Sequence, residues 1–221
     1  AVNYSINKIA GGIESKKHIL GIFIDLSKAF DTINHSILLS KLENYGIRGN
    51  CLNLIKDYLR SRKQYTKFLD EESDLGLIEY GVPQGSVLGP LLFLLYINDI
   101  VNASMNGNFI LFADDTNIFV IANTEDEAYR LANKALSDIN DYMISNQLHI
   151  NMSKCAHMYF QPKVGQNECQ SAARTRPITC IPSLLLNGCK IPKVRKLMFL
   201  GVIIDYLSWH DHNIVQCACR K

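Results

Sequence analysis

The sequence lacks long runs of apolar residues. The longest run, LLFLLYI at residues 91–97, is far shorter than the roughly 20 residues that a membrane-spanning helix needs. The first residues show no secretion-signal pattern, and Ala1 is interpreted as an excision point and not as a natural start. We therefore expect partners other than a membrane.

Ordered cysteine patterns are missing as well. The seven cysteines are an odd number, and no two of them form a CxxC pair. Free thiols in a reducing, intracellular compartment are the simplest interpretation, with nucleus and cytoplasm not distinguished. The alternative is a zinc site at His210, His212, Cys217 and Cys219, but residues two apart on a helix point in divergent directions, which disfavours it.

A large excess of one charge is also absent, because the formal net charge is only +2. The hydrophobic content of 48% and the charged content of 20% are typical of a globular chain with a buried core. The charges are nevertheless uneven: residues 1–153 hold 13 Lys and Arg against 18 Asp and Glu, and residues 154–221 hold 10 against 3. A basic segment on an acidic body suits a phosphate-backbone partner, although a solvated tail would have the same composition.

Residues 109–120, FILFADDTNIFV, contain two β-prone runs that flank Asp114 and Asp115. The two acids followed by Thr116 and Asn117 predict a tight hairpin turn. Adjacent carboxylates repel each other unless a cation is bound near them. Taken alone, a solvated turn would be the simpler interpretation.

A third carboxylate favours a metal site. The strand predicted at residues 21–25, GIFID, ends in Asp25, and three carboxylates form the all-oxygen site that Mg²⁺ prefers. Residues 80–100 begin with a Pro-Gln-Gly turn and continue as an apolar helix to about Asp99, with Ser86 as its cap.

Periodicity and turn signals predict the remaining elements. Helices are expected over residues 3–17, 34–45, 50–59, after the capping box at 124–127, and from Ser208 onward. Strands are expected at 64–69, 75–80, 148–151, 155–160 and 197–205, with an acidic turn at 70–74 and a hairpin over 184–191. Since hairpins dominate, the fold class is α+β with a mostly antiparallel sheet and packed helices.

Five stretches of this sequence occur in an order that resembles a known family. Residues 25–31 (DLSKAFD), 81–90 (GVPQGSVLGP) and 112–115 (FADD) resemble motifs A, B and C of reverse transcriptases. FADD in place of YMDD is typical of LINE-type (non-LTR) retrotransposon enzymes. Residues 151–154 (NMSK) resemble motif D, and residues 199–205 (FLGVIID) resemble motif E. Any one motif is a weak signal, but five in order over nearly the whole chain are a strong one.

The resemblance implies an RNA-directed DNA polymerase that adds deoxynucleoside triphosphates to a DNA primer on an RNA template. The cofactors would be two Mg²⁺ ions, with Mn²⁺ as a substitute. Asp25 and Asp114 are expected to bridge both ions, Asp115 to be a more peripheral third carboxylate, and the backbone carbonyl of Leu26 to complete one coordination shell. Lys154 is the candidate general acid for the pyrophosphate.

The resemblance also implies substrate contacts. Phe30 occupies the sugar-gate position, although burial alone would make it a core residue. Gln84 and Gly85 in the Pro-Gln-Gly turn are expected to contact the incoming nucleotide and the template strand, and Ala113 belongs to the same set of substrate contacts.

Nucleic-acid contacts are expected at two places. Arg60, Arg62 and Lys63 follow a predicted helix, where a phosphate contact and a solvated helix end are about equally favoured. The hairpin of motif E around Phe199, Leu200 and Gly201 matches the primer grip of the family.

The expected organisation is a palm with partial fingers over residues 1–160, a flexible loop over 161–182, and the motif E hairpin with the start of a thumb over 183–221. Only 24 residues precede Asp25 and none resembles the fingers. We also find no endonuclease-like or RNase H-like stretch, so a palm-centred fragment with truncated fingers and thumb is expected. The alternatives are a non-catalytic nucleic-acid-binding relic, and a palm enzyme such as a cyclase, which the Pro-Gln-Gly turn disfavours.

Overall fold

The structure is a computed structural model of the chain and describes residues 2–161 and 183–205. The chain forms two compact units. The first unit contains residues 1–25, 103–140 and 151–221, and the second contains residues 26–102 and 141–150. Each unit is therefore built from separate stretches of the sequence.

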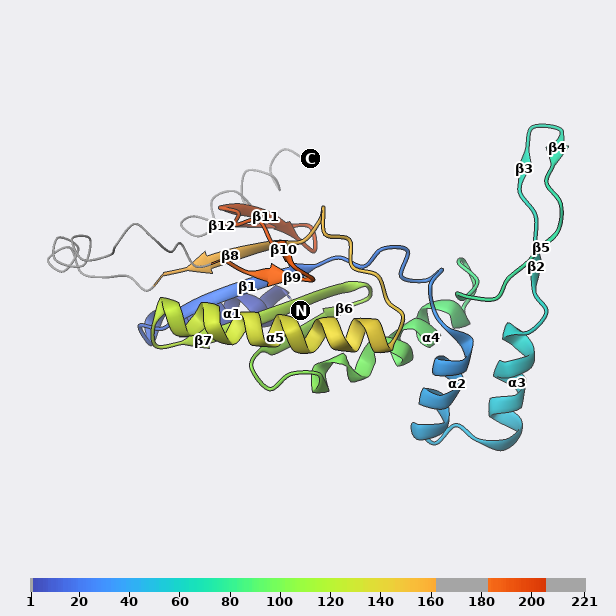
Figure 1. Cartoon of the computed structure of the whole chain (residues 1–221), viewed down its shortest axis with the longest axis horizontal. Coiled ribbons are helices and arrows are strands. Elements are labelled where there is room, and N and C mark those ends of the chain that lie inside the picture. Colours follow the sequence, from blue (N-terminus) through green and yellow to red (C-terminus); the bar gives the residue numbers. More distant parts are fainter. Residues whose placement is uncertain (1, 162–182, 206–221) are drawn as a thin grey trace, which may run out of the picture. The chain divides into compact units, whose positions relative to one another are not determined.

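The first unit is organised on a four-stranded sheet with the order β6-β7-β1-β8 (Figure 1). Its strands are β1 (His18–Ile24), β6 (Asn108–Phe112), β7 (Asp115–Ala122) and β8 (Ala156–Phe160). All neighbouring strands are antiparallel, which confirms the predicted sheet type. The central strands β1 and β7 are buried at nearly every position, which explains why their sequences are almost continuously apolar.

Helices cover both faces of this sheet. In Figure 1, α5 (Glu125–Ser145) passes in front of the sheet and α1 (Val2–Glu14) lies behind it. Ile9 of α1 packs against Ile19, Phe23 and Phe119, and a Cβ on Gly12 would lie 2.6 Å from the Ile19 side chain. On the other face, Tyr129 of α5 contacts the ring of His157 edge-on.

The start of α5 confirms the predicted capping box in one of its two hydrogen bonds, because the Glu127 carboxylate binds the residue before the N-cap and not the N-cap itself. The Thr124 hydroxyl accepts a hydrogen bond from the Glu127 N–H at 3.2 Å, and the Glu127 carboxylate accepts one from the Asn123 N–H at 3.1 Å. Ala128, Ala132, Ala135, Leu136 and Ile139 form the buried stripe expected from the helical spacing.

Two small hairpins complete the described part of the first unit. In the first, β9 (Leu185–Leu186) and β10 (Cys189–Lys190) are joined by Asn187 and Gly188, both with positive φ, as predicted. The second consists of β11 (Lys196–Phe199) and β12 (Val202–Asp205). The prediction of one strand over residues 197–205 was therefore wrong, because Leu200 and Gly201, with φ of 49° and 78°, reverse the chain.

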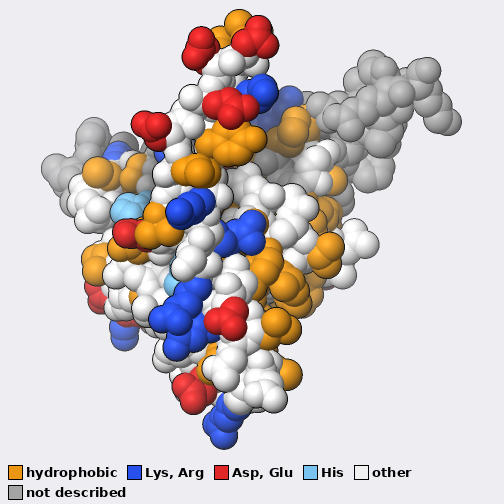
Figure 2. All heavy atoms as spheres, turned by 90° about the vertical axis from the view of Figure 1, so that its right-hand side faces the viewer, with side chains coloured by type: hydrophobic (Ala, Val, Ile, Leu, Met, Phe, Trp, Pro, Cys, Tyr) orange, Lys and Arg blue, Asp and Glu red, His pale blue; other side chains and the backbone are white. Residues whose placement is uncertain are grey.

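The second unit contains a helical part and a long hairpin. Its helices are α2 (His35–Asn44), α3 (Gly49–Leu59), α4 (Leu88–Ile97) and the 3₁₀ helix η1 (Asn98–Asn102). The hairpin is formed by β2 (Lys63–Gln64) with β5 (Gly76–Leu77) and by β3 (Lys67–Phe68) with β4 (Glu71–Glu72). Figure 2 shows acidic side chains at the far end of this hairpin.

The boundaries in the second unit follow the sequence signals in part. The Asn34 side chain accepts from the N–H groups of Ser36 and Ile37 and caps α2, which Gly46 terminates with a φ of 91°. The acidic turn predicted at residues 70–74 was misplaced, because Glu71 and Glu72 are paired as β4.

Two further expectations need correction. The helix predicted to reach Asp99 ends at Ile97, where the chain tightens into η1. The strand predicted at residues 148–151 is reduced to a single bridge between Leu26 and Ile150. The pairing does not extend beyond this one pair of residues, so no strand is formed.

A polar cluster fixes the segment 141–150 in the second unit. The ammonium group of Lys41 donates to Asp99 at 2.6 Å, and the Tyr142 hydroxyl donates to the same carboxylate oxygen at 2.6 Å. The Tyr96 hydroxyl donates to the Asn146 carbonyl at 2.6 Å. Burial lowers the pKa of Lys41, and the hydrogen bond to Asp99 opposes that shift.

Several expectations concern thiols and membranes. Cys51, Cys155 and Cys189 are free thiols. No helix within residues 2–161 and 183–205 has the length and apolar character to cross a membrane. The possible zinc residues His210, His212, Cys217 and Cys219, the helix from Ser208 and the loop after Gln161 lie outside the described residues. The predicted domain boundaries at 160 and 182 stay a prediction.

Candidate active site

The sheet of the first unit brings Asp25 and Asp115 together. Ile24, the last residue of β1, pairs with Thr116 of β7, so Asp25 and Asp115 are the next opposed residues at this end of the two strands. Opposed side chains of antiparallel strands lie on the same face, about 5 Å apart at Cβ. Asp114 directly precedes Asp115, so the three predicted residues are located at the same end of the sheet.

The turn beside these carboxylates is shorter than predicted. Only Ala113 and Asp114 separate β6 from β7, and Ala113 has a φ of 51°. Thr116 and Asn117, predicted as turn residues, are buried in β7, where the Asn117 side chain donates to the Ile110 carbonyl at 3.2 Å. The shorter turn places Asp115 in the strand, opposite Phe112.

The carboxylates interact through their charges. Burial raises the pKa of Asp115, and the neighbouring charges of Asp114 and Asp25 raise it further, whereas Lys154 lowers it. The Oδ2 atom of Asp25 is buried and accepts no hydrogen bond from any described residue. Its cationic neighbour is the ammonium group of Lys154 at 3.5 Å, on a side chain that is 66% exposed.

These observations bear on the expected metal site. A buried carboxylate oxygen without a hydrogen bond, on a side chain whose charge acts on Asp115, is a ligand that a hard divalent cation takes. The residues therefore fit Mg²⁺ or Mn²⁺ by chemistry. Within residues 2–161 and 183–205, however, no three acidic, His or Cys side chains converge as a ready-made metal cluster.

Lys154 is held near Asp25 through the backbone. The Asn151 N–H donates to the Asp25 carbonyl at 2.9 Å, and the Lys154 N–H donates to the Asn151 carbonyl at 3.0 Å. The Ser153 hydroxyl donates to the Asn151 side chain at 2.7 Å. This turn therefore fixes the backbone of Lys154, while its largely exposed side chain extends to Asp25.

The β11–β12 hairpin lies on the same sheet face as the carboxylates. The ring of Phe199 is 5.6 Å from that of Phe23, centroid to centroid, and Phe23 lies two residues before Asp25 on the same face of β1. Phe199 is buried, Leu200 is half-buried and Gly201 is exposed at the turn. The structure thus places the predicted primer-grip residues on the carboxylate face.

The predicted substrate contacts outside the hairpin turn belong to the second unit. Leu26 is its first residue and is buried. The half-buried ring of Phe30 lies 4.8 Å from that of Phe93 in α4. Gln84 donates to the Asp31 carboxylate at 2.8 Å, and Gly85, with a φ of 79°, continues the same turn.

Gly81 brings the Pro-Gln-Gly turn against the loop after β1. Its φ is +82°, and a Cβ there would lie 2.8 Å from backbone atoms of Phe30 and Asp31. The Val82 N–H donates to the Phe30 carbonyl at 2.8 Å. The position therefore requires glycine for both conformation and space.

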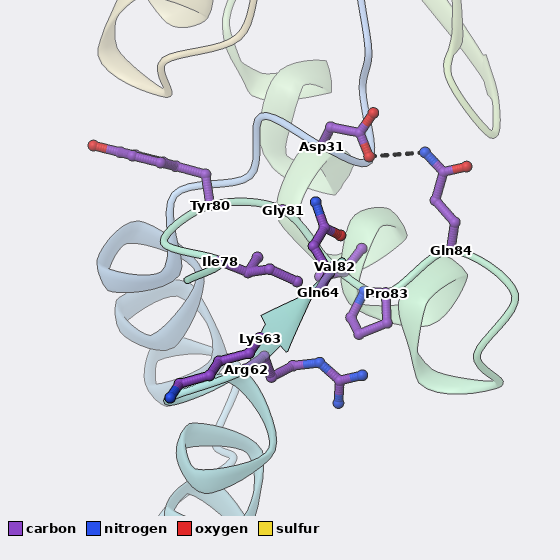
Figure 3. A pocket seen from close by; sticks show the side chains of 10 residues that line it. All are labelled: Asp31, Arg62, Lys63, Gln64, Ile78, Tyr80, Gly81, Val82, Pro83 and Gln84. Carbon is purple, nitrogen blue, oxygen red and sulfur yellow. Dashed lines mark hydrogen bonds between the residues drawn. The ribbon is translucent and has the colours of Figure 1, made fainter. Parts of the chain in front are cut away.

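The three predicted basic residues follow α3. Arg60 is the C-cap residue of this helix, and Lys63 is exposed on β2. The guanidinium group of Arg62 lies 5.2 Å from the centre of the Tyr58 ring. Arg62 and Lys63, but not Arg60, line a pocket (Figure 3) together with Asp31 and Tyr80, which were not predicted as site residues. For Asp31, its position directly after Phe30 was an available signal.

Comparisons with known proteins agree with the geometry. Residues 5–204 match the model of the family described as Reverse transcriptase (RNA-dependent DNA polymerase). The chain is 27% identical over 207 residues to the RNA-directed DNA polymerase from mobile element jockey of Drosophila funebris. The aligned residues cover 90% of this chain and 21% of the relative. It is 28% identical over 219 residues to the probable RNA-directed DNA polymerase from transposon X-element of Drosophila melanogaster. This alignment covers 97% of the chain and 22% of that relative.

Solved structures show the same fold. A telomerase from Candida tropicalis, in complex with a fragment of telomeric RNA, superposes with a TM-score of 0.62 at 13% identity and covers 94% of this chain and 32% of that one. An apo telomerase from the same organism, truncated from its C-terminal domain, gives a TM-score of 0.59 at 14% identity, with 94% and 38% covered. The predicted α+β palm fold is confirmed.

The extent of these matches decides the assignment. The chain spans about a fifth of the length of the curated relatives, at 21% and 22%. The family model nevertheless covers residues 5–204 of the 221. This chain therefore belongs to the reverse transcriptase family, and polymerases of LINE-like mobile elements are among its relatives.

Proposed function

We propose that this chain carries the polymerase centre of an RNA-directed DNA polymerase from a LINE-like retroelement. The reaction is the addition of deoxynucleotides to a DNA primer along an RNA template. The observation that carries this proposal is the strand register, in which Asp25 follows the Ile24 and Thr116 pair and so opposes Asp115, with Asp114 beside it.

The proposed cofactors are two Mg²⁺ ions, which Mn²⁺ can replace. Asp25 and Asp114 would hold both ions, Asp115 would be a more peripheral ligand, and the Leu26 carbonyl would complete one shell. When bound, such ions lower the pKa of the primer 3′-hydroxyl and stabilise the charge on the leaving pyrophosphate. The buried Oδ2 atom of Asp25 supports this ligand set.

Lys154 supplies the proposed proton. Its ammonium group is 3.5 Å from Asp25 and is largely exposed, so it can reach a phosphate group bound beside the carboxylates. Donation of a proton to the leaving pyrophosphate, or simple charge neutralisation, would lower the barrier. The turn at Asn151 supports the role, because it anchors the lysine to the backbone of Asp25.

The remaining site residues position substrates in this proposal. Phe30 excludes a 2′-hydroxyl group, and Gln84, Gly85 and Ala113 contact the incoming nucleotide and the template. Arg60, Arg62 and Lys63 bind nucleic-acid phosphates, and the hairpin at residues 199–201 holds the primer end. The position of Phe199 on the carboxylate face supports the last of these roles.

Primer extension on an RNA template, in Mg²⁺ and in Mn²⁺, tests the proposal. Asp114→Asn should abolish extension while the melting temperature changes little, because Asp114 is only partly buried in a turn between two strands and the substitution keeps its shape. Asp70→Asn, at the far end of the β3–β4 hairpin, is the matched control. Extension that persists in Asp114→Asn would eliminate the mechanism, and template binding without extension by the wild type would favour the non-catalytic relic.

A further inference from the structure

The hairpin of the second unit exposes a group of large apolar side chains. They are between 53% and 79% exposed and comprise Tyr65, Phe68, Leu69, Leu75 and Leu77. The ladder that carries them consists of two pairs of two-residue strands. A two-stranded hairpin without a covering element is marginally stable in water, and a group of exposed apolar side chains typically marks an interaction surface. The hairpin is therefore expected to bind a partner.

The outer part of this hairpin, residues 67–74, is acidic as well as apolar, and we call it the hairpin tip. It contains one lysine and four acidic residues, a net charge of −3. Figure 2 shows acidic and hydrophobic side chains together at this end of the hairpin. Lys67 pairs with Glu72 at 3.0 Å, so it neutralises only one of the four carboxylates. The tip would repel the phosphates of nucleic acids and anionic lipids, so its chemistry selects a basic protein surface.

The first unit contains a surface of the opposite charge. Residues 190–196, which run from β10 to β11, hold four cations and no acid, and we call them the basic strip. All four cations are exposed, namely Lys190, Lys193, Arg195 and Lys196. Tip and strip are complementary in charge, and every copy of the chain carries both. A second copy is therefore the partner that the observations favour.

A small pocket opens beside the basic strip. Its volume is about 220 Å³, and it is lined by Tyr159, Gln161, Lys193, Val194 and Arg195. The Lys193 ammonium lies 4.8 Å from the centre of the Tyr159 ring. The volume is below the roughly 300–1,000 Å³ of small-ligand sites, so one inserted side chain is a better match than a free ligand. An aromatic ring there would lie beside two cations, which cation–π attraction favours.

Phe68 is the side chain of the hairpin tip that matches this pocket. It is 75% exposed, and it pairs with Glu71 across β3 and β4. Opposed residues of antiparallel strands have their side chains on the same face. The ring of Phe68 and the carboxylate of Glu71 therefore project together, as the pocket and its two cations lie together. The two surfaces match in shape and in charge.

We propose that the hairpin tip binds the basic strip of a second copy of this chain, with Phe68 in the small pocket and Glu71 next to Lys193 and Arg195. The two surfaces differ, so the contact is heterologous and joins copies head to tail. One inserted ring with a few charges around it is a small interface, so the association is weak and transient. The inference goes beyond the proposed function, because it uses neither the carboxylates nor a nucleic acid.

The experiment is sedimentation equilibrium of the 221-residue chain over a range of concentrations, in EDTA and without nucleic acid. The mass of the wild type should rise with concentration at low salt, and the rise should diminish at high salt because screening weakens the ion pairs. A tip variant, Phe68→Ala with Glu71→Lys, should weaken association about tenfold or more, as the loss of a central anchor residue does. A strip variant, Lys193→Glu with Arg195→Glu, should do the same.

The matched controls change equivalent groups elsewhere in the same units. Leu54→Ala removes a side chain that is 71% exposed on α3. Lys134→Glu reverses an exposed cation on α5. Both variants should associate like the wild type, because neither residue belongs to the hairpin tip or to the basic strip.

A mixture of the two double variants tests the head-to-tail geometry. The strip variant retains an intact tip and the tip variant retains an intact strip, so the mixture can form one native contact. It should therefore form dimers and no larger species, while each variant alone stays monomeric. Recovered association would also show that both variants are folded.

Three results would overturn the inference. The first is a wild type that stays monomeric at every concentration. The second is a loss of association in Leu54→Ala or Lys134→Glu equal to that in the double variants, and the third is a mixture of the double variants that stays monomeric. Melting temperatures of the variants close to that of the wild type would show that the losses arise at the contact and not from unfolding.

Discussion

The negative charge of Asp115 destabilises the folded state, and a bound cation would remove this destabilisation. Its pKa is raised by burial and by Asp114 and Asp25, so the folded chain holds its proton more tightly than the unfolded chain. Without metal, this group makes stability fall as pH rises from its ordinary value of 3.8 through the raised value. The three carboxylates thus couple stability at this end of the sheet to pH and to cations.

Asp115→Asn should therefore raise the melting temperature at pH 7 in EDTA and flatten the pH dependence above pH 4. With Mg²⁺ in excess, the difference in melting temperature between the variant and the wild type should become smaller. Metal binding then stabilises the wild type, and the variant has partly lost this metal binding. Thermal melts in EDTA and in Mg²⁺ across this pH range measure both effects. Superimposable pH profiles for the two proteins would show that the carboxylates do not interact.

Two roles can be distinguished for the ring of Phe30. If it is a sugar gate, Phe30→Ala should admit ribonucleotides with a smaller loss of deoxynucleotide use, because exclusion of a 2′-hydroxyl needs bulk and not a hydrogen bond. If it is a core residue, the variant should lose less than the ~3–5 kcal/mol of a fully buried phenylalanine, since the ring is half-buried against Phe93.

Incorporation of ribonucleotides and deoxynucleotides by the wild type and Phe30→Ala, with melts of both, decides between these roles. Phe93→Ala, at a fully buried ring, calibrates the cost of losing the contact. An unchanged sugar preference together with a strongly lowered melting temperature would leave Phe30 as a core residue.

The carboxylates could be predicted as a group because each follows or precedes a β-prone run. Their detailed setting could not, since it depends on strand register. Thr116 and Asn117 have turn-compatible side chains, yet the pairing of β7 with both β6 and β1 buries them in the sheet. Asp31 was missed because its partner Gln84 is distant in sequence.

At the level of elements, β8 contains a buried histidine whose protonation destabilises the folded state. His157 is 2% exposed, and its Nδ1 atom has no hydrogen-bond partner in the described part of the chain. Burial, and then the charge of Lys193, lower its pKa from 6.5 to about 4. The folded state therefore keeps the ring neutral while the unfolded state takes up a proton.

This lowered pKa gives a stability contribution that is fully present above pH 6.5 and is lost as pH falls toward 4. His157→Leu should remove that acid-dependent loss, which amounts to up to about 3 kcal/mol by linkage. Chemical denaturation at several pH values measures the slope, with His149→Gln at an exposed position as the control. An identical pH slope in the wild type and His157→Leu would contradict the assignment.

The Pro-Gln-Gly turn offers a second test on the scale of an element. Gly81→Ala should lower the melting temperature, because a Cβ would lie 2.8 Å from the backbone of Phe30 and Asp31 at positive φ. Gly49→Ala is a matched control, since its φ of +59° is also positive but nothing lies within 4 Å of its Cβ. Equal effects of the two substitutions would show that conformation alone matters.

Elements with local signals were the most predictable. The α2 cap at Asn34, the α5 capping box and the Asn187-Gly188 turn depend on neighbours within a few residues. The β11–β12 hairpin was expected from the resemblance to motif E, whereas the local pattern indicated one strand, because Leu200 and Gly201 interrupt the apolar run without a polar residue. The bridge at Ile150 has its partner at Leu26, which no local pattern reveals.

For the whole molecule, the 221 residues alone should be a weak polymerase. The residues before Asp25 form β1 and α1, which packs on the sheet through Ile9, and they do not resemble the basic fingers that bind a triphosphate. The KM for deoxynucleotides should therefore be higher for these residues alone than for a chain extended at both ends. Equal KM values would show that such extensions are dispensable.

The discontinuous second unit has a consequence during synthesis on the ribosome. Residues 26–102 emerge well before Tyr142 and Asn146, which are the partners of Asp99 and Tyr96. At ~5–20 residues per second, that wait is roughly 2–9 seconds. In this interval the nascent chain exposes an incomplete unit, and a chaperone that binds emerging apolar segments would find it there before α5 closes the cluster.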